Sequence, residues 1–302
     1  MDLQLVAENL GFPEGPVALS DGSILVTEIR YGVLARITLD GQRRVVAETG
    51  GGPNGAAIGP DGAVYITNNG GLTWRDRGGC HIPGPLPPNH KGGSIQRVDL
   101  HTGRVTTLYE DCEDERLIAP NDLVFDRSGG FWFTDHGCST RGGRRFGALY
   151  YAQPDGSEIV RARSNLLSPN GVGLSPDETK LYVADTMLAR LWAFDIEGPG
   201  RLKPPEGFAP GRVICNLQGY QQLDSLAVEA GGVICVGTLV KGGVTAINPT
   251  GENEHFAFPD FATTNLCFGG ADMRDVWVTC SSTGKLYKCR WPRSGLKLNF
   301  NA

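Results

Sequence analysis

Six copies of one short pattern limit how this 302-residue chain can fold more than any other feature of its sequence. Each copy starts with a small residue or proline and a polar acid or amide, and continues with alternating apolar residues. A tight turn and two further strand-like runs follow each copy. The six copies begin the segments 13–19, 53–58, 120–125, 169–174, 223–228 and 264–268.

The repeat predicts an all-β protein, because its apolar residues alternate with a period of two. Six four-stranded units at this spacing are typical of a propeller. We therefore expect one six-bladed β-propeller domain over residues 1–302, with four-stranded antiparallel blades around a central channel. Residues 3–6 should form the outer strand of the last blade, which would close the ring and hide an open sheet edge.

Composition and charge limit the kinds of molecule that this protein can bind. The 43 glycines and 19 prolines suit many short strands joined by turns. The net charge is −5 and no basic run occurs, which excludes a typical nucleic-acid-binding protein. No apolar stretch is long enough to cross a membrane, and the first residues do not resemble a signal peptide. We expect a cytoplasmic protein that does not bind nucleic acid or membrane; the sequence leaves its oligomeric state open.

One repeat is interrupted by an insert at about 70–93. This segment contains Trp74, two histidines and four prolines, and it has no strand pattern. Long loops of this kind inside compact domains are commonly functional. We expect it to lie over one face of the propeller as a lid, with Trp74 near the substrate pocket.

The polar position of the repeat points to a metal. The first strand of each propeller blade lines the channel, so these residues should surround one of its mouths: Glu14, Asn54, Asn121, Asn170, Asp224 and Asn265. Two buried carboxylates repel each other, and a divalent cation removes that penalty. An all-oxygen set favours Ca²⁺, with Mg²⁺, Mn²⁺, Fe²⁺ and Zn²⁺ as alternatives. The competing interpretation is that each Asn or Asp only stabilises a local turn.

A second polar column ends the second strand of the blades and should approach the same face. Asp135 and His136 are its candidates for substrate contact or proton transfer, although a loop histidine held by hydrogen bonds would look the same. Arg141, Arg144 and Arg145 follow closely in the chain. Such a cluster is either a solvated loop or a binding site for an anionic substrate.

Several of these segments together resemble the regucalcin (senescence marker protein)/gluconolactonase-like family. The resemblance covers essentially the whole chain and rests on FPEGP at 12–16, PND at 120–122, SPNGV at 168–172, LDSLA at 223–227, TNLCFGG at 264–270 and VWVT at 276–279. It implies a six-bladed propeller with one divalent metal ion bound by Glu14, Asn170 and Asp224. It also implies that Asn121 is a further metal ligand or a substrate contact.

Members of this family are mostly hydrolases of sugar lactones, and related propellers cleave phosphotriesters. Some sugar lactonases carry arginine where this chain has Ala119, which argues against the same sugar acid lactone. The expected function is a metal-dependent hydrolase, of the carboxylic ester hydrolase class, that opens a lactone. A hydrolase of other esters or phosphotriesters and a non-catalytic binding propeller are the alternatives.

In the expected mechanism the metal polarises the carbonyl group and activates water. Asp224 is the candidate general base and Glu14 is mainly a ligand, with Asp135 or His136 in reserve. Asn54, Asn121, Asp135, His136 and Trp74 are the expected substrate contacts. No Gly-x-Ser-x-Gly segment occurs, so a serine hydrolase is not indicated.

Overall fold

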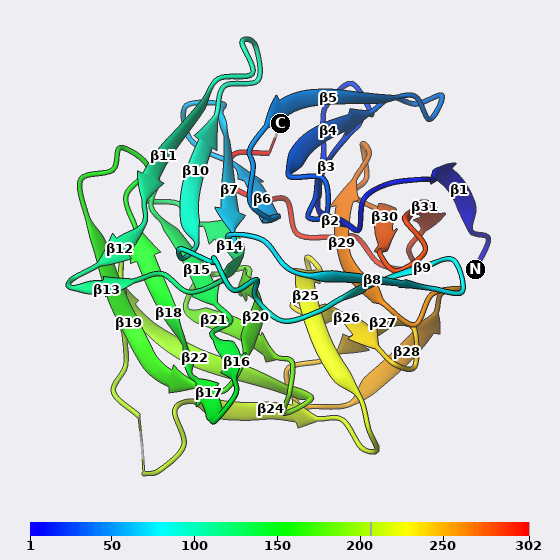
Figure 1. Cartoon of the computed structure of the whole chain (residues 1–302). Coiled ribbons are helices and arrows are strands. Elements are labelled where there is room, and N and C mark those ends of the chain that lie inside the picture. The colour runs from blue at the N-terminus through cyan, green and yellow to red at the C-terminus, as the bar shows by residue number, and fades with distance from the viewer. Residues whose placement is uncertain (206, 302) are drawn as a thin grey trace.

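The chain forms a closed ring of six β-sheets around a central channel, as the repeat predicts (Figure 1). The computed structural model describes residues 1–205 and 207–301, and these contain strands and turns but no helix. Each sheet is antiparallel and consists of four strands, except that one blade carries an additional short strand. The prediction of an all-β, six-bladed propeller is confirmed.

The first three blades follow the chain in order, each from its innermost to its outermost strand. Blade 1 contains β2 (Pro13–Ala18), β3 (Ile24–Glu28), β4 (Val33–Ile37) and β5 (Arg43–Glu48). Blade 2 contains β6 (Pro53–Ile58), β7 (Val64–Asn68), β10 (Ser94–Val98) and β11 (Val105–Tyr109). Blade 3 contains β14 (Pro120–Phe125), β15 (Phe131–Asp135), β18 (Gly147–Ala152) and β19 (Ile159–Leu166).

The last three blades have the same arrangement, except that the outermost strand of blade 6 comes from the start of the chain. Blade 4 contains β20 (Pro169–Leu174), β21 (Lys180–Asp185), β22 (Arg190–Gly198) and β24 (Arg212–Asn216), with β23 (Arg201–Leu202) paired to β22. Blade 5 contains β25 (Gln222–Val228), β26 (Ile234–Leu239), β27 (Gly243–Ile247) and β28 (Asn253–Ala257). Blade 6 contains β29 (Thr263–Gly269), β30 (Asp275–Cys280), β31 (Lys285–Arg290) and β1 (Gln4–Ala7).

The first strand of the chain completes blade 6, beside the last strand. Strand β1 pairs antiparallel with β31, with Gln4 opposite Lys288 and Leu5 opposite Tyr287. The expected closure by the N-terminal segment is confirmed, and it protects the edge of β31 from other chains.

The innermost strands pack tightly around the channel. Every residue of β2, β14 and β20 is buried. Gly171 shows how closely neighbouring blades approach, because a Cβ atom there would lie 2.6 Å from the Leu226 amide nitrogen and 2.7 Å from the Asp224 carbonyl oxygen. Over the described residues, no helix is both long and apolar enough to span a bilayer.

The insert of blade 2 is more ordered than its sequence indicates. It contains a two-stranded hairpin of β8 (Trp74–Arg77) and β9 (Cys80–Pro83), and the expectation of a segment without strands is wrong. The four hairpin pairs place Trp74 opposite Pro83 and Arg77 opposite Cys80. Period-two alternation is absent because the hairpin stands apart from the blades and has no buried face of its own.

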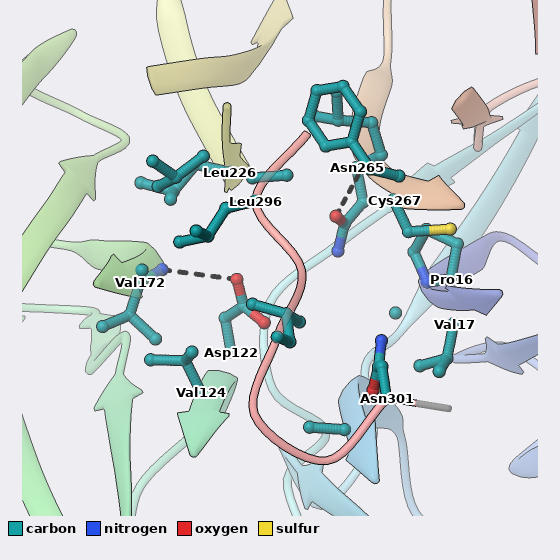
Figure 2. A pocket seen from close by; sticks show the side chains of 18 of the residues that line it. Pro16, Val17, Asp122, Val124, Val172, Leu226, Asn265, Cys267, Leu296 and Asn301 are labelled. Atoms are coloured by element: carbon teal, nitrogen blue, oxygen red, sulfur yellow. Dashed lines mark hydrogen bonds between the residues drawn. The ribbon is translucent and has the colours of Figure 1, made fainter. Parts of the chain in front are cut away.

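A C-terminal strap, residues 292–301, crosses the channel on the side opposite the insert (Figures 1 and 2). Its backbone bonds to blade 6 through Gly295 and Met273 (2.7 Å) and to blade 5 through Leu296 and Val228 (2.8 Å). Its Asn299 amide donates to the Phe125 carbonyl oxygen of blade 3 at 3.2 Å. The strap therefore connects several blades across the back of the ring.

Candidate functional site

A local irregularity in every innermost strand aims one side chain into the channel. In β2, Glu14 pairs with Thr27 but Val17 pairs with Leu25, so β2 contains one residue more than its partner over this stretch. Shifts at equivalent places occur in β6, β14, β20, β25 and β29. Such bulges bend the strand and re-aim side chains, and they are common beside active sites.

The strand register corrects one member of the predicted ring. The residue opposite the end of the second strand is Pro169 in β20, where it faces Asp185, and Thr263 in β29, where it faces Cys280. Thr264 is therefore equivalent to Asn170, and Asn265 is one position further along. The apolar residues that follow pair in the same way in every blade, for example Val172 with Val183 and Leu266 with Val278. Counting back from these residues in the sequence would have identified Thr264 as the ring position.

The corrected ring lies at one end of a cavity of about 740 Å³. All six of its members line this cavity: Glu14, Asn54, Asn121, Asn170, Asp224 and Thr264. Residues of the insert, among them Arg75, His81 and Ile82, form part of the wall. The insert thus borders the cavity, as expected of a lid, and His136 also lines it.

A second cavity lies at the strap side of the channel and is much smaller, about 80 Å³ (Figure 2). Asp122 and Asn265 line it, together with Leu296, Leu298 and Asn301 of the strap. Asn265 donates a hydrogen bond of 2.8 Å from its amide nitrogen to Oε2 of Glu14, so it supports the ring from behind.

Three carboxyl groups are buried in the channel without a cationic side chain among the groups that shift them. Burial raises the pKa of Glu14 to about 6 and that of Asp122 to about 8, where the charge of Glu14 adds to the effect. Burial and the charges of Glu14 and Asp122 raise the pKa of Asp224 well above its usual value. These shifts mean that the site is short of positive charge. The repeat does not mark Asp122 as a site residue, because glycine occupies the equivalent position in three other blades.

Two amide oxygens in the ring also lack partners. The Oδ1 atoms of Asn54 and Asn121 are buried and accept no hydrogen bond within the described part of the chain. Buried polar atoms without a partner are rare in native proteins and commonly indicate an ion or water that binds there. Unpaired oxygens beside uncompensated carboxylates are the donor set that a hard divalent cation prefers.

Threonine hydroxyls hold neighbouring blades in place at this level. Thr27 donates to the Asn54 carbonyl oxygen, Thr67 to that of Asn121 and Thr134 to that of Asn170, each at 2.5 Å. Each bond joins the second strand of one blade to the ring residue of the next blade. The amide side chains of the ring are consequently held on a fixed backbone.

Asp135 does not line the cavity, contrary to the role expected for it. Its carboxylate accepts hydrogen bonds from the backbone N–H groups of Ile118 (2.6 Å), Ala119 (2.9 Å) and Gly137 (2.9 Å). Successive side chains of a strand point to opposite faces of the sheet. Because Thr134 points toward the ring, Asp135 points away from it. Asp135 therefore fixes the loops beside Asn121 and His136 without facing the cavity.

Trp74 is also absent from the cavity wall. Its ring packs against Phe12, with centroids 5.1 Å apart, and Phe12 does line the cavity. Trp74 therefore supports the wall from behind.

His136 is held in one tautomer. Its Nδ1 atom lies 3.2 Å from Nη2 of Arg144, and a guanidinium can only donate, so Nδ1 accepts and the proton resides on Nε2. Burial and the Arg144 charge lower the pKa of His136 to about 4. The imidazole is neutral near pH 7 and offers the cavity an N–H donor.

A polar latch fastens the lid hairpin to the propeller. Asp76 accepts hydrogen bonds from Arg30 of blade 1 (2.9 Å from Nη2 to Oδ2), and its Oδ1 atom lies 2.8 Å from Nδ1 of His81. The backbone N–H of His81 donates to the Ser282 carbonyl oxygen of blade 6 at 2.7 Å. The hairpin is thus attached to two blades through few bonds, most of them exposed.

Asp76→Ala should loosen this hairpin and leave the blades unchanged. We expect hydrogen exchange of the amides of β8 and β9 to accelerate by about tenfold, because exposed polar contacts stabilise local structure only weakly. Arg77→Ala on the same hairpin is the control and should not change the exchange. A fall in the unfolding temperature without faster exchange in the hairpin would show that the latch supports the blades instead.

The geometry defines a class of protein: a six-bladed propeller with a ring of carboxylate and amide oxygens in a cavity that the insert of blade 2 borders. Residues 12–282 match the SMP-30/Gluconolactonase/LRE-like region family, and the chain belongs to this family. A gluconolactonase from Zymomonas mobilis is 25% identical over 222 residues, which are 66% of this chain and 56% of that protein. The chain thus aligns with little more than half the length of that curated relative.

Solved structures agree with this assignment at the level of the fold. A gluconolactonase from Xanthomonas campestris superimposes with a TM-score of 0.75 at 22% identity, covering 96% of this chain and 89% of that one. Regucalcin from Agrobacterium tumefaciens, described as a calcium-binding protein, superimposes with a TM-score of 0.71 at 18% identity, covering 97% and 94%.

Proposed function

We propose that this chain is a divalent-metal-dependent lactonase that acts at the ring around Glu14 and Asp224. The observation that carries the proposal is the convergence of buried carboxylates and unpaired amide oxygens at the end of one cavity. The gluconolactonase names of a curated relative and of a solved structure support a cyclic ester as the substrate.

Glu14, Asn121, Asn170 and Asp224 are the residues that would hold the metal ion. Among residues 1–205 and 207–301, no three His, Cys, Asp or Glu side chains form a metal-binding group, so amide oxygens would have to complete the coordination. Ca²⁺ accepts such neutral oxygen ligands readily, and a related fold is that of a calcium-binding protein. Mg²⁺, Mn²⁺, Fe²⁺ and Zn²⁺ remain alternatives that metal analysis would distinguish.

When bound, the ion would polarise the lactone carbonyl group and stabilise the negative charge that develops on its oxygen. Asp224 would accept a proton from the water that attacks the carbonyl carbon. Asp224 would then pass this proton to the ester oxygen of the lactone as the acyl C–O bond breaks. One water is consumed and one hydroxy acid leaves the cavity.

The other cavity residues would bind and orient the substrate. His136 suits a hydrogen-bond donor better than a general base, because its unprotonated Nδ1 atom is already occupied by Arg144. Asn54 lines the same cavity and would contact substrate hydroxyl groups. Asp224 is left as the base.

A lactone panel with controlled metal content tests this function. We expect the protein to hydrolyse γ- or δ-lactones, to lose this activity when a chelator strips it and to regain it with Ca²⁺. A fluorophosphate and a linear ester in the same panel separate a lactonase from the other hydrolases. Full activity in demonstrably metal-free protein, or no hydrolysis of any compound in loaded protein, would refute the proposal.

A further inference from the structure

Positive charge lines the wall of the cavity above the acidic ring. Arg75 of β8 and Arg144 of β17 (Gly143–Arg145) both contribute to the lining. Among residues 1–205 and 207–301, neither arginine forms an ion pair with a carboxylate. Arg75 is exposed on the insert of blade 2. Arg144 is half-buried in a hairpin between two strands of blade 3, which consists of β16 (Cys138–Thr140) and β17. Of the two arginines, Arg144 is therefore the one whose position is fixed by surrounding residues.

Neutral acceptors fix the Arg144 guanidinium. Its Nε atom donates to the Leu167 carbonyl oxygen at 2.6 Å, Nη2 to the His136 carbonyl oxygen at 2.6 Å, and Nη1 to Oγ of Ser139 at 3.3 Å. These contacts orient the group without cancelling its charge. The second N–H of Nη2 points to Nδ1 of His136 at 3.2 Å, so four donors are in use. A guanidinium carries five N–H donors, so one N–H group of Nη1 remains for a ligand.

Asp185, the carboxylate whose charge acts on Arg144, does not form an ion pair with it. Asp185 attracts Arg144, but its carboxylate accepts hydrogen bonds from the Ser168 hydroxyl (2.7 Å) and backbone N–H (3.3 Å) instead. Burial lowers the pKa of Arg144, which is the effect of a charge that lacks a close counterion. A half-buried, oriented and uncompensated guanidinium in a ligand cavity is an anion-binding group.

We propose that Arg144, assisted by the Nε2–H group of His136, binds a carboxylate carried by the lactone substrate. The inference rests on the proposed lactonase function and names its substrate class: lactones that bear an acid group outside the ring. The single charge of the guanidinium matches that of a carboxylate, and the remaining N–H group of Arg144 and the Nε2–H group of His136 supply one donor for each of its two oxygens.

Two lactones that differ in a single group test this specificity. An aldarolactone ends in a carboxylate where the aldonolactone of the same ring ends in CH₂OH. We expect the wild-type protein to favour the aldarolactone in kcat/KM. Arg144→Gln should lower the ratio of kcat/KM for the aldarolactone to kcat/KM for the aldonolactone on the order of 30-fold. A loss of this size corresponds to the free energy that a hydrogen bond to a charged group usually contributes. Arg141→Gln, on the exposed turn of the same hairpin, is the matched control and should leave the ratio unchanged.

Binding provides a readout that does not depend on turnover. A sugar acid should bind the wild-type protein measurably in calorimetry, and Arg144→Gln should weaken it by a similar factor, whereas a neutral polyol should bind both proteins equally. An unaltered ratio together with unaltered sugar-acid binding would overturn the inference and leave the lactonase proposal standing. Sugar-acid binding through Arg144 without hydrolysis of any lactone would refute the lactonase function alone. If Arg144→Gln fails to fold, the aldarolactone preference of the wild-type protein decides: no preference would refute the inference.

Discussion

Asp224→Asn is expected to abolish metal retention and to reduce lactone hydrolysis by at least about 1,000-fold. The variant keeps the shape of the side chain but removes one of the two proposed acidic ligands and the proposed base, and a general base alone contributes about 100- to 10,000-fold. Glu14→Gln should lose the metal in the same way, because it removes the charge of the second proposed acidic ligand. The Glu14 carboxylate is held in the ring by hydrogen bonds from the Gly15 N–H (3.0 Å) and the Asn265 amide (2.8 Å). Metal content by elemental analysis and kcat/KM on the best lactone of the panel are the measurements.

The fold should survive these substitutions. Without metal, Asp224 lies buried near the charges of Glu14 and Asp122, and this repulsion opposes folding. Metal-free Asp224→Asn protein should therefore unfold at the same temperature as metal-free wild type or at a higher one. Asp155→Asn, at an exposed turn, is the control and should retain both metal and activity. Unchanged turnover in both ring variants would eliminate the proposed site.

The sequence could predict the ring because each of its members follows the same local rule. A polar residue behind a small residue or proline marks the bulged start of an innermost strand, and six such starts must converge in a closed propeller. Five of the six predicted residues occupy the ring. The sixth failed because Thr264 and Asn265 are both polar, and only pairing with Cys280 and Thr279 shows which of them is equivalent to Asn170.

Features that depend on contacts between distant segments could not be predicted in this way. Asp122 faces the second cavity because the residue after the ring position points to the other side, where glycine is the usual occupant. Asp135 was expected in the site because its strand ends near it, but backbone amides from another loop engage its carboxylate. The strap has no repeat and no periodicity that would indicate where it lies.

The insert of blade 2 and the strap make the two ends of the channel different. The larger cavity adjoins the ring on the lid side, whereas the strap occupies the other side and leaves only a small cavity there. Substrate and product are therefore expected to use the lid side. The strap would also shield the buried acids from solvent on its own side, which is the condition under which their charges matter most.

Truncation of the chain after Arg293 is expected to destabilise the propeller by about 3 kcal/mol or more. The deletion exposes apolar surface under Leu296 and Phe300, and burial of one such side chain contributes about 1.5–3 kcal/mol. It also removes the bonds of Gly295 and Leu296 to blades 6 and 5 and the Phe300 contact with Phe125, whose ring centroids lie 5.8 Å apart. Truncation before residue 294 keeps Arg293 and its ion pair with the buried Glu229, so that loss of this pair does not complicate the result.

Thermal unfolding and hydrogen exchange of the innermost strands are the measurements for this truncation. We expect a lower unfolding temperature and faster exchange in β20 and β25, since solvent gains access to the back of the channel. Lys297→Ala, which alters an exposed side chain of the strap, should change neither quantity. If the truncated protein unfolds within about one degree of the full chain, the strap does not hold the blades together, and closure of the ring depends on the pairing of β1 with β31 alone.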